Sequence, residues 1–489
     1  MRFTHRSLLA SLLLVVTVIS VTHLSAAPSP DLALTHVTVI SPGDPDPQSD
    51  MTILIRGRDI VLVAKTSSTE LPSSAKVIDA RGKFVIPGLW DMHMHFRDPI
   101  RDLKLDIANG VLGVRNMGGP AKEVLPLRDS IASDRVLGPR MFASGPIVDG
   151  PDSWSDPRFT VSVKTADEAR AAVLSLKEQG VDFVKVYDGL SRESYFAIAG
   201  ETQGLGLPFA GHLPAPISVR EASEAGQRSL EHGMALAGGS TSEAQHIKQR
   251  LDQSVFKEAL STKNFALIPA KLAKDETEML DHFSQDRADE TYKLLARNNT
   301  FITPTLVTER ALTFVDDLNQ KPDPRMQYVA PEDLNWWKPE NGMLTKYRTP
   351  EYIAMRKRQY AMTLQQIPRA RKLGVPLLAG TDITIPFTYP GFSLHDELGL
   401  FVEAGLTPMQ ALETATINPA RFFGLSKTWG RIASGYTANL VLLDADPLAN
   451  ISNTEKINSV VVNGRLLERG QLDQLLAQSK PATTSPPQR

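Results

Sequence analysis

The middle of the chain, residues 87–425, alternates short apolar runs with amphipathic stretches of helical period. Strands that each lead into a helix are typical of a parallel α/β fold, and eight such units close into a barrel. The eight candidate strands are GLWDMHMHF, GVLGVRNM, GPRMFASG, DFVKVYDG, LPFAGHL, RSLEHG, TFITPTLV and VPLLAGTDI. Helices are expected at 218–227 and at 165–180, where Thr165 is a candidate N-cap and Gly180 ends the pattern. We therefore predict a (β/α)8 TIM-type barrel.

Both ends of the chain have a different pattern, of short β-branched runs separated by Gly, Pro, Asp and Asn. This pattern is typical of antiparallel strands. The simplest interpretation is one small β-sandwich domain that both ends build, with the barrel inserted between its two parts. The predicted division is 31–86 and 426–472 for the β-sandwich, 87–425 for the barrel, and 473–489 for a polar, proline-rich, disordered tail.

One segment, 311–362, interrupts the barrel pattern and is rich in Pro and Asp. An insertion of this length is often a lid or a binding loop. A surface elaboration without a catalytic role is an equally good interpretation.

The first residues resemble a secretory signal peptide, predicted at 1–27. Arg2 and Arg6 precede an apolar stretch that ends at Val21, and small residues follow it. The alternative, an uncleaved anchor, is disfavoured because the stretch is shorter than the ~20 residues that span a bilayer. We expect a secreted or periplasmic protein without stable membrane insertion after cleavage. Since the chain has no cysteine, any metal must be bound by nitrogen and oxygen.

Six polar residues stand at the ends of five predicted strands, where such barrels carry their active sites. They are His93 and His95 on the first strand, Lys185 on the fourth, His212 on the fifth, His232 on the sixth and Asp382 on the eighth. Each alone could be structural, for example a histidine bonded to the backbone or an aspartate that caps a helix. Their occurrence together, in this order, favours a single metal centre.

Neutral imidazoles and a carboxylate suit Zn²⁺ or a similar divalent ion. A lysine ammonium has no acceptor and cannot ligate. Lys185 therefore either pairs with a carboxylate or is carbamylated by CO2, and the carbamate would bridge two ions. Two metals that share a hydroxide would activate it and polarise a carbonyl. Asp382 could then accept the hydroxide proton and pass it to the leaving nitrogen.

These motifs, DMHMHF, KVYDG, GH, EHG and GTD, resemble those of the metal-dependent amidohydrolase superfamily. The segments at 394–425 and 430–451 are similar to the imidazolonepropionase-like branch, although that branch usually has Ala-Asp-Leu where this chain has Ala438, Asn439 and Leu440. Members with a strand-four lysine are binuclear enzymes with a carboxylated lysine, among them Xaa-Pro and Xaa-Lys/Arg dipeptidases. The resemblance implies one ion on His93, His95 and Asp382, a second on His212 and His232, and Lys185 as the bridge.

Two further residues are weaker candidates. Tyr187 shares the face of Lys185 and could stabilise an oxyanion, or it could be a packed tyrosine. Arg97 could bind a substrate carboxylate, or it could pair with Asp98 or another acid. His395 and Glu397 receive no role.

The leading hypothesis is an exported binuclear hydrolase of a non-cyclic amide, in a dipeptide or an N-acyl amino acid. The same site could open a lactone, an ester or a cyclic amide, and an inactive envelope binding protein is a further alternative. The 53 basic and 55 acidic residues are nearly balanced and dispersed, so the expected partner is a small-molecule substrate and no nucleic acid. Homo-oligomer formation is left open.

Overall fold

The computed structural model describes residues 31–151, 153, 155–233, 236, 258–259, 261–318, 321–338, 340–342, 346–383 and 385–481. The predicted signal peptide, 1–27, and residues 482–489 of the predicted tail lie outside this part of the chain. Within it, every helix is too short or too polar to cross a membrane.

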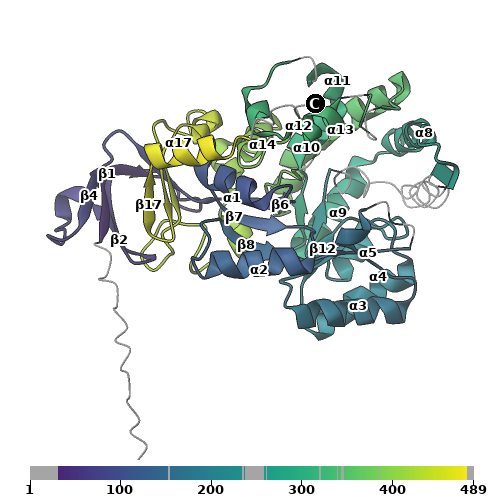
Figure 1. Ribbon diagram of the computed structural model, residues 1–489, viewed down its shortest axis with the longest axis horizontal. Coiled ribbons are helices and arrows are strands. Elements are labelled where there is room, and N and C mark those ends of the chain that lie inside the picture. Colours follow the sequence, from purple (N-terminus) through teal and green to yellow (C-terminus); the bar gives the residue numbers. More distant parts are fainter. Residues whose placement is uncertain are drawn as a thin grey trace, which may run out of the picture.

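Strands from both ends of the chain form one sheet of eight strands (Figure 1). Its members are β1 (Leu32–Val39), β2 (Gln48–Arg56), β3 (Asp59–Lys65), β4 (Lys76–Asp79), β5 (Phe84–Pro87), β15 (Leu440–Leu443), β16 (Ile457–Val462) and β17 (Arg465–Glu468). The two ends meet where β15 pairs antiparallel with β5, from Leu440 opposite Pro87 to Leu443 opposite Phe84. A β-sandwich needs a second sheet packed on the first, and that second sheet stays a prediction. The predicted domain boundaries also stay predictions.

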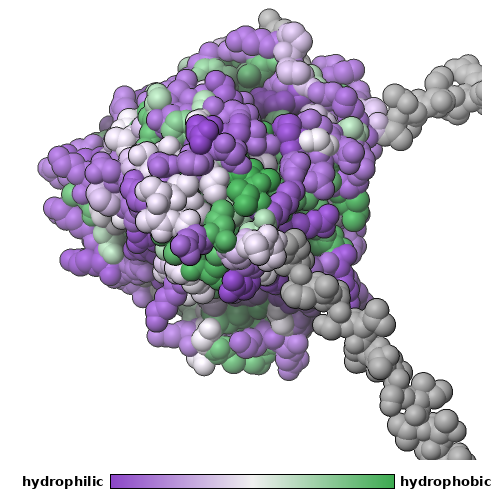
Figure 2. All heavy atoms as spheres, turned by 90° about the vertical axis from the view of Figure 1, so that its left-hand side faces the viewer, coloured by the Kyte–Doolittle hydropathy of each residue, from purple (hydrophilic) through white to green (hydrophobic). Residues whose placement is uncertain are grey.

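The sheet has its own hydrophobic core, in which Leu34, Ile53 and Ile60 are fully buried with Leu440 and Val461. Figure 2 views the molecule from this end and shows hydrophilic side chains over most of the face, with smaller apolar groups between them. The strands of this sheet therefore turn most of their apolar side chains inward.

The predicted tail needs a correction, because residues 473–478 belong to the helix α17 (Arg469–Gln478). Leu472 of this helix is fully buried, and the side chain of Arg469 reaches back to the carbonyl of Ile457 at 2.9 Å. The buried Leu472 and the hydrogen bond from Arg469 to β16 hold α17 in place. The polar composition of this segment did not predict a helix.

The centre of the chain forms two sheets in which all strands are parallel. One contains β6 (Leu89–Met94), β7 (Val111–Asn116) and β8 (Arg140–Ala143), and the other contains β9 (Ile147–Asp149), β10 (Thr160–Ser162), β11 (Val184–Val186), β12 (Phe209–Gly211), β13 (Ser229–Glu231) and β14 (Phe301–Thr303). Seven of the predicted strands are confirmed, and β9 and β10 are additional. Among the described residues the pairing does not run without a break around a ring.

The predicted eighth strand, 375–383, is not a continuous strand. It makes single parallel bridges, from Leu377 to Ile302 of β14 and from Ile383 to Met94 of β6. The backbone of Asp382, between these two bridges, is left-handed at φ 51°. The segment still lies between β14 and β6 and brings Asp382 beside the end of β6.

Helices follow the parallel strands as predicted. They are α1 (Pro99–Ala108), α2 (Ala121–Ala132), α3 (Ala166–Gln179), α4 (Arg192–Gly204), α5 (Val219–Glu224), α8 (Leu267–Asp281), α9 (Gln285–Arg297), α14 (Phe392–Glu403), α15 (Pro408–Thr414) and α16 (Ile417–Phe422). Short 3-10 helices are η1 (Thr66–Ser68), η2 (Pro157–Phe159) and η5 (Ile451–Glu455). Thr165 caps α3 by accepting from the Glu168 amide, and Gly180 ends it in a left-handed conformation, as expected.

The insertion folds into helices that group at the top of Figure 1. Together with the preceding strand end it contains α10 (Leu306–Thr313), α11 (Val315–Leu318), η4 (Pro324–Tyr328), α12 (Pro331–Trp337) and α13 (Pro350–Lys372). Trp337 is buried with Val315, Phe387 and Tyr389 in a separate hydrophobic cluster. The insertion is therefore packed against the segment that follows Asp382.

Candidate metal centre

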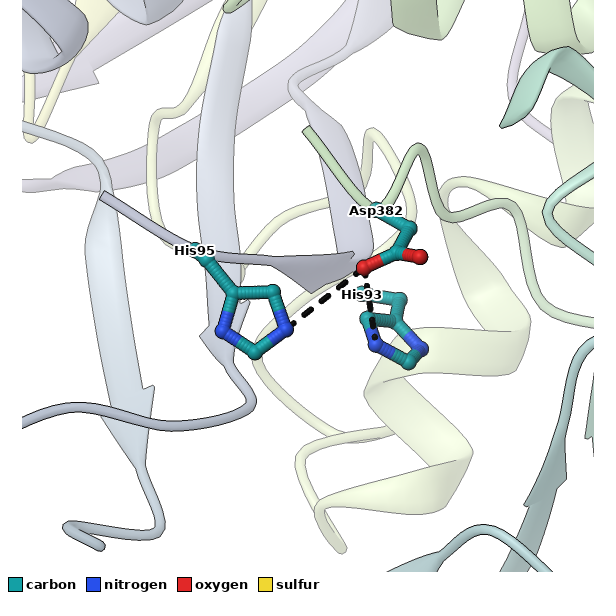
Figure 3. A group of neighbouring side chains, drawn as sticks. All are labelled: His93, His95 and Asp382. Carbon is teal, nitrogen blue, oxygen red and sulfur yellow. Dashed lines mark ion pairs between the residues drawn. The ribbon is translucent and has the colours of Figure 1, made fainter. Parts of the chain in front are cut away.

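Three of the predicted ligands converge on one point. His93 and His95 leave the end of β6 on the same face, because side chains two positions apart in a strand point the same way. Figure 3 shows both rings directed at one carboxylate oxygen of Asp382, which lies 3.4 Å from Nε2 of His93 and 3.5 Å from Nε2 of His95. One ligand atom from each residue lies within 4.8 Å of the others. This separation lets one ion bind all three.

The position of Asp382 depends on Asp91, which the sequence analysis left without a role. Its buried carboxylate accepts hydrogen bonds from the backbone N–H of Thr381 at 3.0 Å and of His93 at 3.1 Å. It also accepts from the Thr381 hydroxyl at 2.5 Å. Asp91 thus ties the end of β6 to the segment that carries Asp382.

The ring of His93 is held by a buried ion pair. Its Nδ1 lies 2.9 Å from Oε2 of Glu231, so Nδ1 donates and Nε2 keeps a lone pair that points to Asp382. Nη2 of Arg115 binds the two carboxylate oxygens of Glu231 at 2.9 and 2.8 Å, and both side chains are fully buried. Burial and then the charge of Lys185 lower the pKa of His93 well below its usual value. The imidazole is therefore neutral, the form that binds a metal.

His212 and His232 form a second pair of donors. Their Nε2 atoms lie 2.9 Å apart. Both oxygens of the Asp188 carboxylate lie 3.1 Å from Nδ1 of His212, which donates to them and leaves a lone pair on Nε2. Nδ1 of His232 lies 2.9 Å from the Thr305 hydroxyl. When Nδ1 of His232 donates to this hydroxyl, its Nε2 has a lone pair that faces the lone pair on Nε2 of His212. A cation bound to both nitrogens removes the repulsion between the two lone pairs.

The two groups of donors are close to each other. Nδ1 of His232 lies 4.0 Å from the second carboxylate oxygen of Asp382. The backbones of His232, Thr305 and Asp382 are all left-handed, at φ 67°, 48° and 51°. Such conformations cost about 1–3 kcal/mol each and are common at active sites, where the surrounding structure enforces them.

Lys185 is fully buried in β11. Its Nζ has no hydrogen-bond partner among the residues that the structure describes. Burial is the main cause that lowers its pKa to about 8, against the opposing charges of Glu231 and Asp382. Burial likewise raises the pKa of Asp382 to about 8. A buried amine with a lowered pKa, without a hydrogen-bond partner among the described residues, differs from the solvated ammonium of an ordinary lysine.

The two weaker candidates have different surroundings. The ring of Tyr187 lies 4.1 Å from the ring of His212, and burial raises the pKa of its hydroxyl well above the usual value, so it stays a donor. Arg97 does not pair with Asp98. Its Nη2 lies 2.7 Å from Asp333 of the insertion, and its guanidinium lies 5.7 Å above the ring of Trp336.

His395 and Glu397 connect elements. Nδ1 of His395 lies 2.9 Å from the Thr454 hydroxyl, and its Nε2 lies 2.9 Å from the carbonyl of Asn109. The Glu397 carboxylate accepts from the backbone of Leu306 at 3.0 Å and of Val307 at 2.7 Å, so it caps α10. Both contacts support structural roles for these residues.

Sequence reasoning missed the residues that orient the ligands. Glu231 and Asp188 stand directly beside predicted site residues, in EHG and VYDG, and this adjacency was an available signal. Arg115, like Lys185, is a charged residue inside an apolar strand, and that position alone requires a buried partner.

Comparison with known proteins gives a family and a fold. The model of the Amidohydrolase family matches residues 84–467. A dihydroorotase from Streptococcus pyogenes is 37% identical over 93 residues, 19% of this chain and 21% of that protein. The chain therefore matches about a fifth of the length of this curated relative.

Two solved structures share the fold over most of their length. A bottromycin amidohydrolase has a TM-score of 0.71 at 23% identity, over 91% of this chain and 89% of that one. A Xaa-Pro dipeptidase with bound methionine in its active site has a TM-score of 0.64 at 20% identity, over 90% and 100%. At these identities the likeness shows an α/β fold of the TIM-barrel kind.

Proposed function

This chain belongs to the amidohydrolase family, and we propose on that premise that it is a metal-dependent hydrolase of a non-cyclic amide in a dipeptide or an N-acyl amino acid. The observation that carries the proposal is the convergence of His93, His95 and Asp382 at 3.4 and 3.5 Å. The fold shared with an amidohydrolase and a Xaa-Pro dipeptidase supports the choice of an amide.

The residues fit two divalent ions, zinc or similar. His93, His95 and Asp382 would hold one, and His212 and His232 the other, with a carbamate on Lys185 between them. Two ligand atoms that are each ~2.1 Å from one ion lie about 3.4 Å apart at a tetrahedral angle, which agrees with the separations around Asp382. When bound, the ions would polarise a carbonyl and lower the pKa of water.

The protein's own groups would orient the reaction and move protons. Asp382 would take a proton on its carboxylate and deliver it to the leaving nitrogen. Tyr187, whose neutral hydroxyl lies beside His212, would donate to the developing oxyanion. Glu231 and Asp188 would keep His93 and His212 in the tautomer with a free Nε2.

A second candidate is a cyclic amide, favoured by the 93-residue similarity to a dihydroorotase. Lactone or ester opening would use the same groups, since an ester needs less protonation of its leaving group. We also propose export, supported by the character of residues 1–27. An inactive binding protein is less well supported, because the ligand set is complete.

The test is zinc per chain in protein purified with zinc and bicarbonate, for the wild type, Lys185→Ala and a control, Lys177→Ala, at an exposed position of α3. We expect two ions in the wild type and the control, and one or none in Lys185→Ala. The loaded wild type is then screened for amine release from dipeptides, N-acyl amino acids and cyclic amides. One ion in all three proteins would contradict the bridge, and no turnover of any amide would contradict the activity.

A further inference from the structure

A pocket adjoins the metal centre on the side of the insertion. Its lining includes His95 and Arg97 at the end of β6, Tyr328, Asp333 and Trp337 of the insertion, and Tyr389 after the eighth segment. The pocket is open: its cavity volume is about 30 Å³, and the space between its atoms reaches about 410 Å³ only when the solvent at its mouth is counted. Its exposed walls are mostly apolar. Because His95 belongs to both, a group in this pocket starts within a few atoms of the candidate metal site.

The aromatic wall of the pocket is fixed before any ligand arrives. Trp337 is buried, and its ring centroid lies 5.3 Å from Phe387 and 5.7 Å from Tyr389. Tyr328 stacks on Phe392 at 5.4 Å. Aromatic rings packed in this way lose little freedom when a ligand binds.

The charges around the pocket are already compensated. Arg97 pairs with Asp333 at 2.7 Å, and Nε of Arg101 binds Asp102 at 3.0 Å. Asp102 also accepts from the backbone of Arg97 at 2.9 Å and of Asp98 at 3.1 Å. An apolar occupant leaves both pairs intact.

We propose that this pocket receives an apolar side chain or acyl group of the substrate, aromatic or branched aliphatic, and that the insertion thereby sets substrate preference. The inference rests on the proposed function, because it places the scissile amide beside His95. It gives the insertion a binding role, and it makes Arg97 the residue that holds Asp333 and α12 against the end of β6.

The test compares two ligands that cannot be hydrolysed, β-benzoylpropionate and levulinate. They are carbon analogues of N-benzoylglycine and N-acetylglycine and differ only by a phenyl ring in place of a methyl group. Their binding to the zinc-loaded wild type is measured by calorimetry. We expect at least tenfold tighter binding of β-benzoylpropionate. Equal affinities would overturn the proposal without recourse to any variant.

A variant that fills the pocket locates the preference. Val329 lines the pocket and is half-buried, so Val329→Phe should bring the affinity ratio close to one. The matched control is Val77→Phe, since Val77 is exposed on β4 of the other sheet, and it should keep the wild-type ratio. An unchanged ratio in Val329→Phe, with metal content and melting temperature like the wild type, would also overturn the proposal.

Hydrolysis of N-benzoylglycine and N-acetylglycine is assayed separately. A binding preference for the phenyl ligand without turnover of any amide would contradict the proposed function and support the pocket. Turnover of both amides with equal affinities for the two analogues would support the function and contradict the pocket.

Discussion

The two carboxylates that orient the site histidines differ in their surroundings. Glu231 is fully buried and paired with Arg115, so removal of either partner would leave an uncompensated buried charge. The side chain of Asp188 is one-third exposed, at 33%. Replacement of Asp188 should therefore change the free energy of unfolding little. At this position the orientation of His212 can be tested separately from folding.

Asp188→Asn should weaken zinc binding about 10–100-fold, because an uncharged amide is a poorer acceptor for the His212 N–H and makes the imidazole less basic. The melting temperature of the metal-free protein should barely change. Competition with a chelator measures the affinity. Asp167→Asn, at a position of α3 that is 92% exposed, is the control and should match the wild type. Equal zinc affinity in the two variants would show that Asp188 does not orient a ligand.

The candidate ligands, which the structure brings close together, were selected from the sequence because each stands at the end of an apolar run, which is a local pattern. The partner of Arg115 could not be predicted, because Glu231 lies 116 residues away and only the folded barrel brings them together. The same holds for Arg97, whose acidic partner lies in the insertion and not in the next residue. Which side chains pair across strands depends on the register between those strands. This register cannot be derived from a single sequence.

At the scale of elements, both ends of α3 were predicted, since its N-cap bond joins residues only three positions apart. The predicted helix at 218–227 starts correctly at its Ser218 cap but extends past Glu224, where α5 ends. The strands were harder, because β9 and β10 have three residues each and show no alternation. The predicted eighth strand makes only single bridges, and Asp382 within it is left-handed. The sequence pattern of this segment favours a strand, whereas Asp382 has a left-handed backbone. Such departures from the local pattern are expected at functional sites.

The cap of α5 provides a test by pH. Ser218 and Glu221 form a capping box, and Glu221 also pairs with Arg192 of α4 at 2.5 Å. The bond to Arg192 is the main cause that lowers the pKa of Glu221 from 4.5 to about 2. Glu221→Ala should lower the free energy of unfolding by about 1 kcal/mol at neutral pH.

The sign of the pH dependence follows from that lowered pKa. The stabilisation by the Glu221 carboxylate is complete above the unfolded value of 4.5 and is lost as pH falls toward about 2. Melting temperatures of the wild type and Glu221→Ala should therefore converge as the pH is lowered. Glu224→Ala, at the exposed end of the same helix, is the control. A constant difference across the range would mean that the charge of Glu221 plays no part.

At the scale of the whole molecule, two hairpins from opposite ends of the chain touch at two glycines. A Cβ on Gly464, between β16 and β17, would overlap the carbonyl of Gly57, between β2 and β3. Gly464 has φ +81°, and Gly435 has a similar φ of +85° with open space around it. Both glycines have a positive φ, which a residue with a Cβ rarely adopts. Only Gly464 also lies against another backbone group, the carbonyl of Gly57.

Gly464→Ala should therefore destabilise the protein by several kcal/mol more than Gly435→Ala, whose cost is that of the backbone alone, about 1 kcal/mol. Thermal melts of both variants against the wild type measure the difference. Zinc per folded chain should be unchanged, since the hairpins lie in the eight-stranded sheet. Equal melting temperatures of Gly464→Ala and Gly435→Ala would mean that the two hairpins can move apart without loss of stability.

The sharing of one sheet by both ends was predicted from their similar composition. The order of the strands was not, because antiparallel neighbours such as β5 and β15 are recognised by shape and register and carry no matching sequence signal. The packing of α17 was missed for a similar reason, since it depends on one buried leucine and on a bond from Arg469 to a residue of β16.

The position of β15 also determines when the protein can be completed during its synthesis. A ribosome makes β5 and β6 early, because they end at Pro87 and Met94, while β15 begins only at Leu440. Until that late segment emerges, one edge of β5 has unpaired N–H and C=O groups, which can pair with other nascent chains. Premature termination after His95 and before β15 therefore yields a fragment that carries His93 and His95 but joins them to an open, aggregation-prone edge.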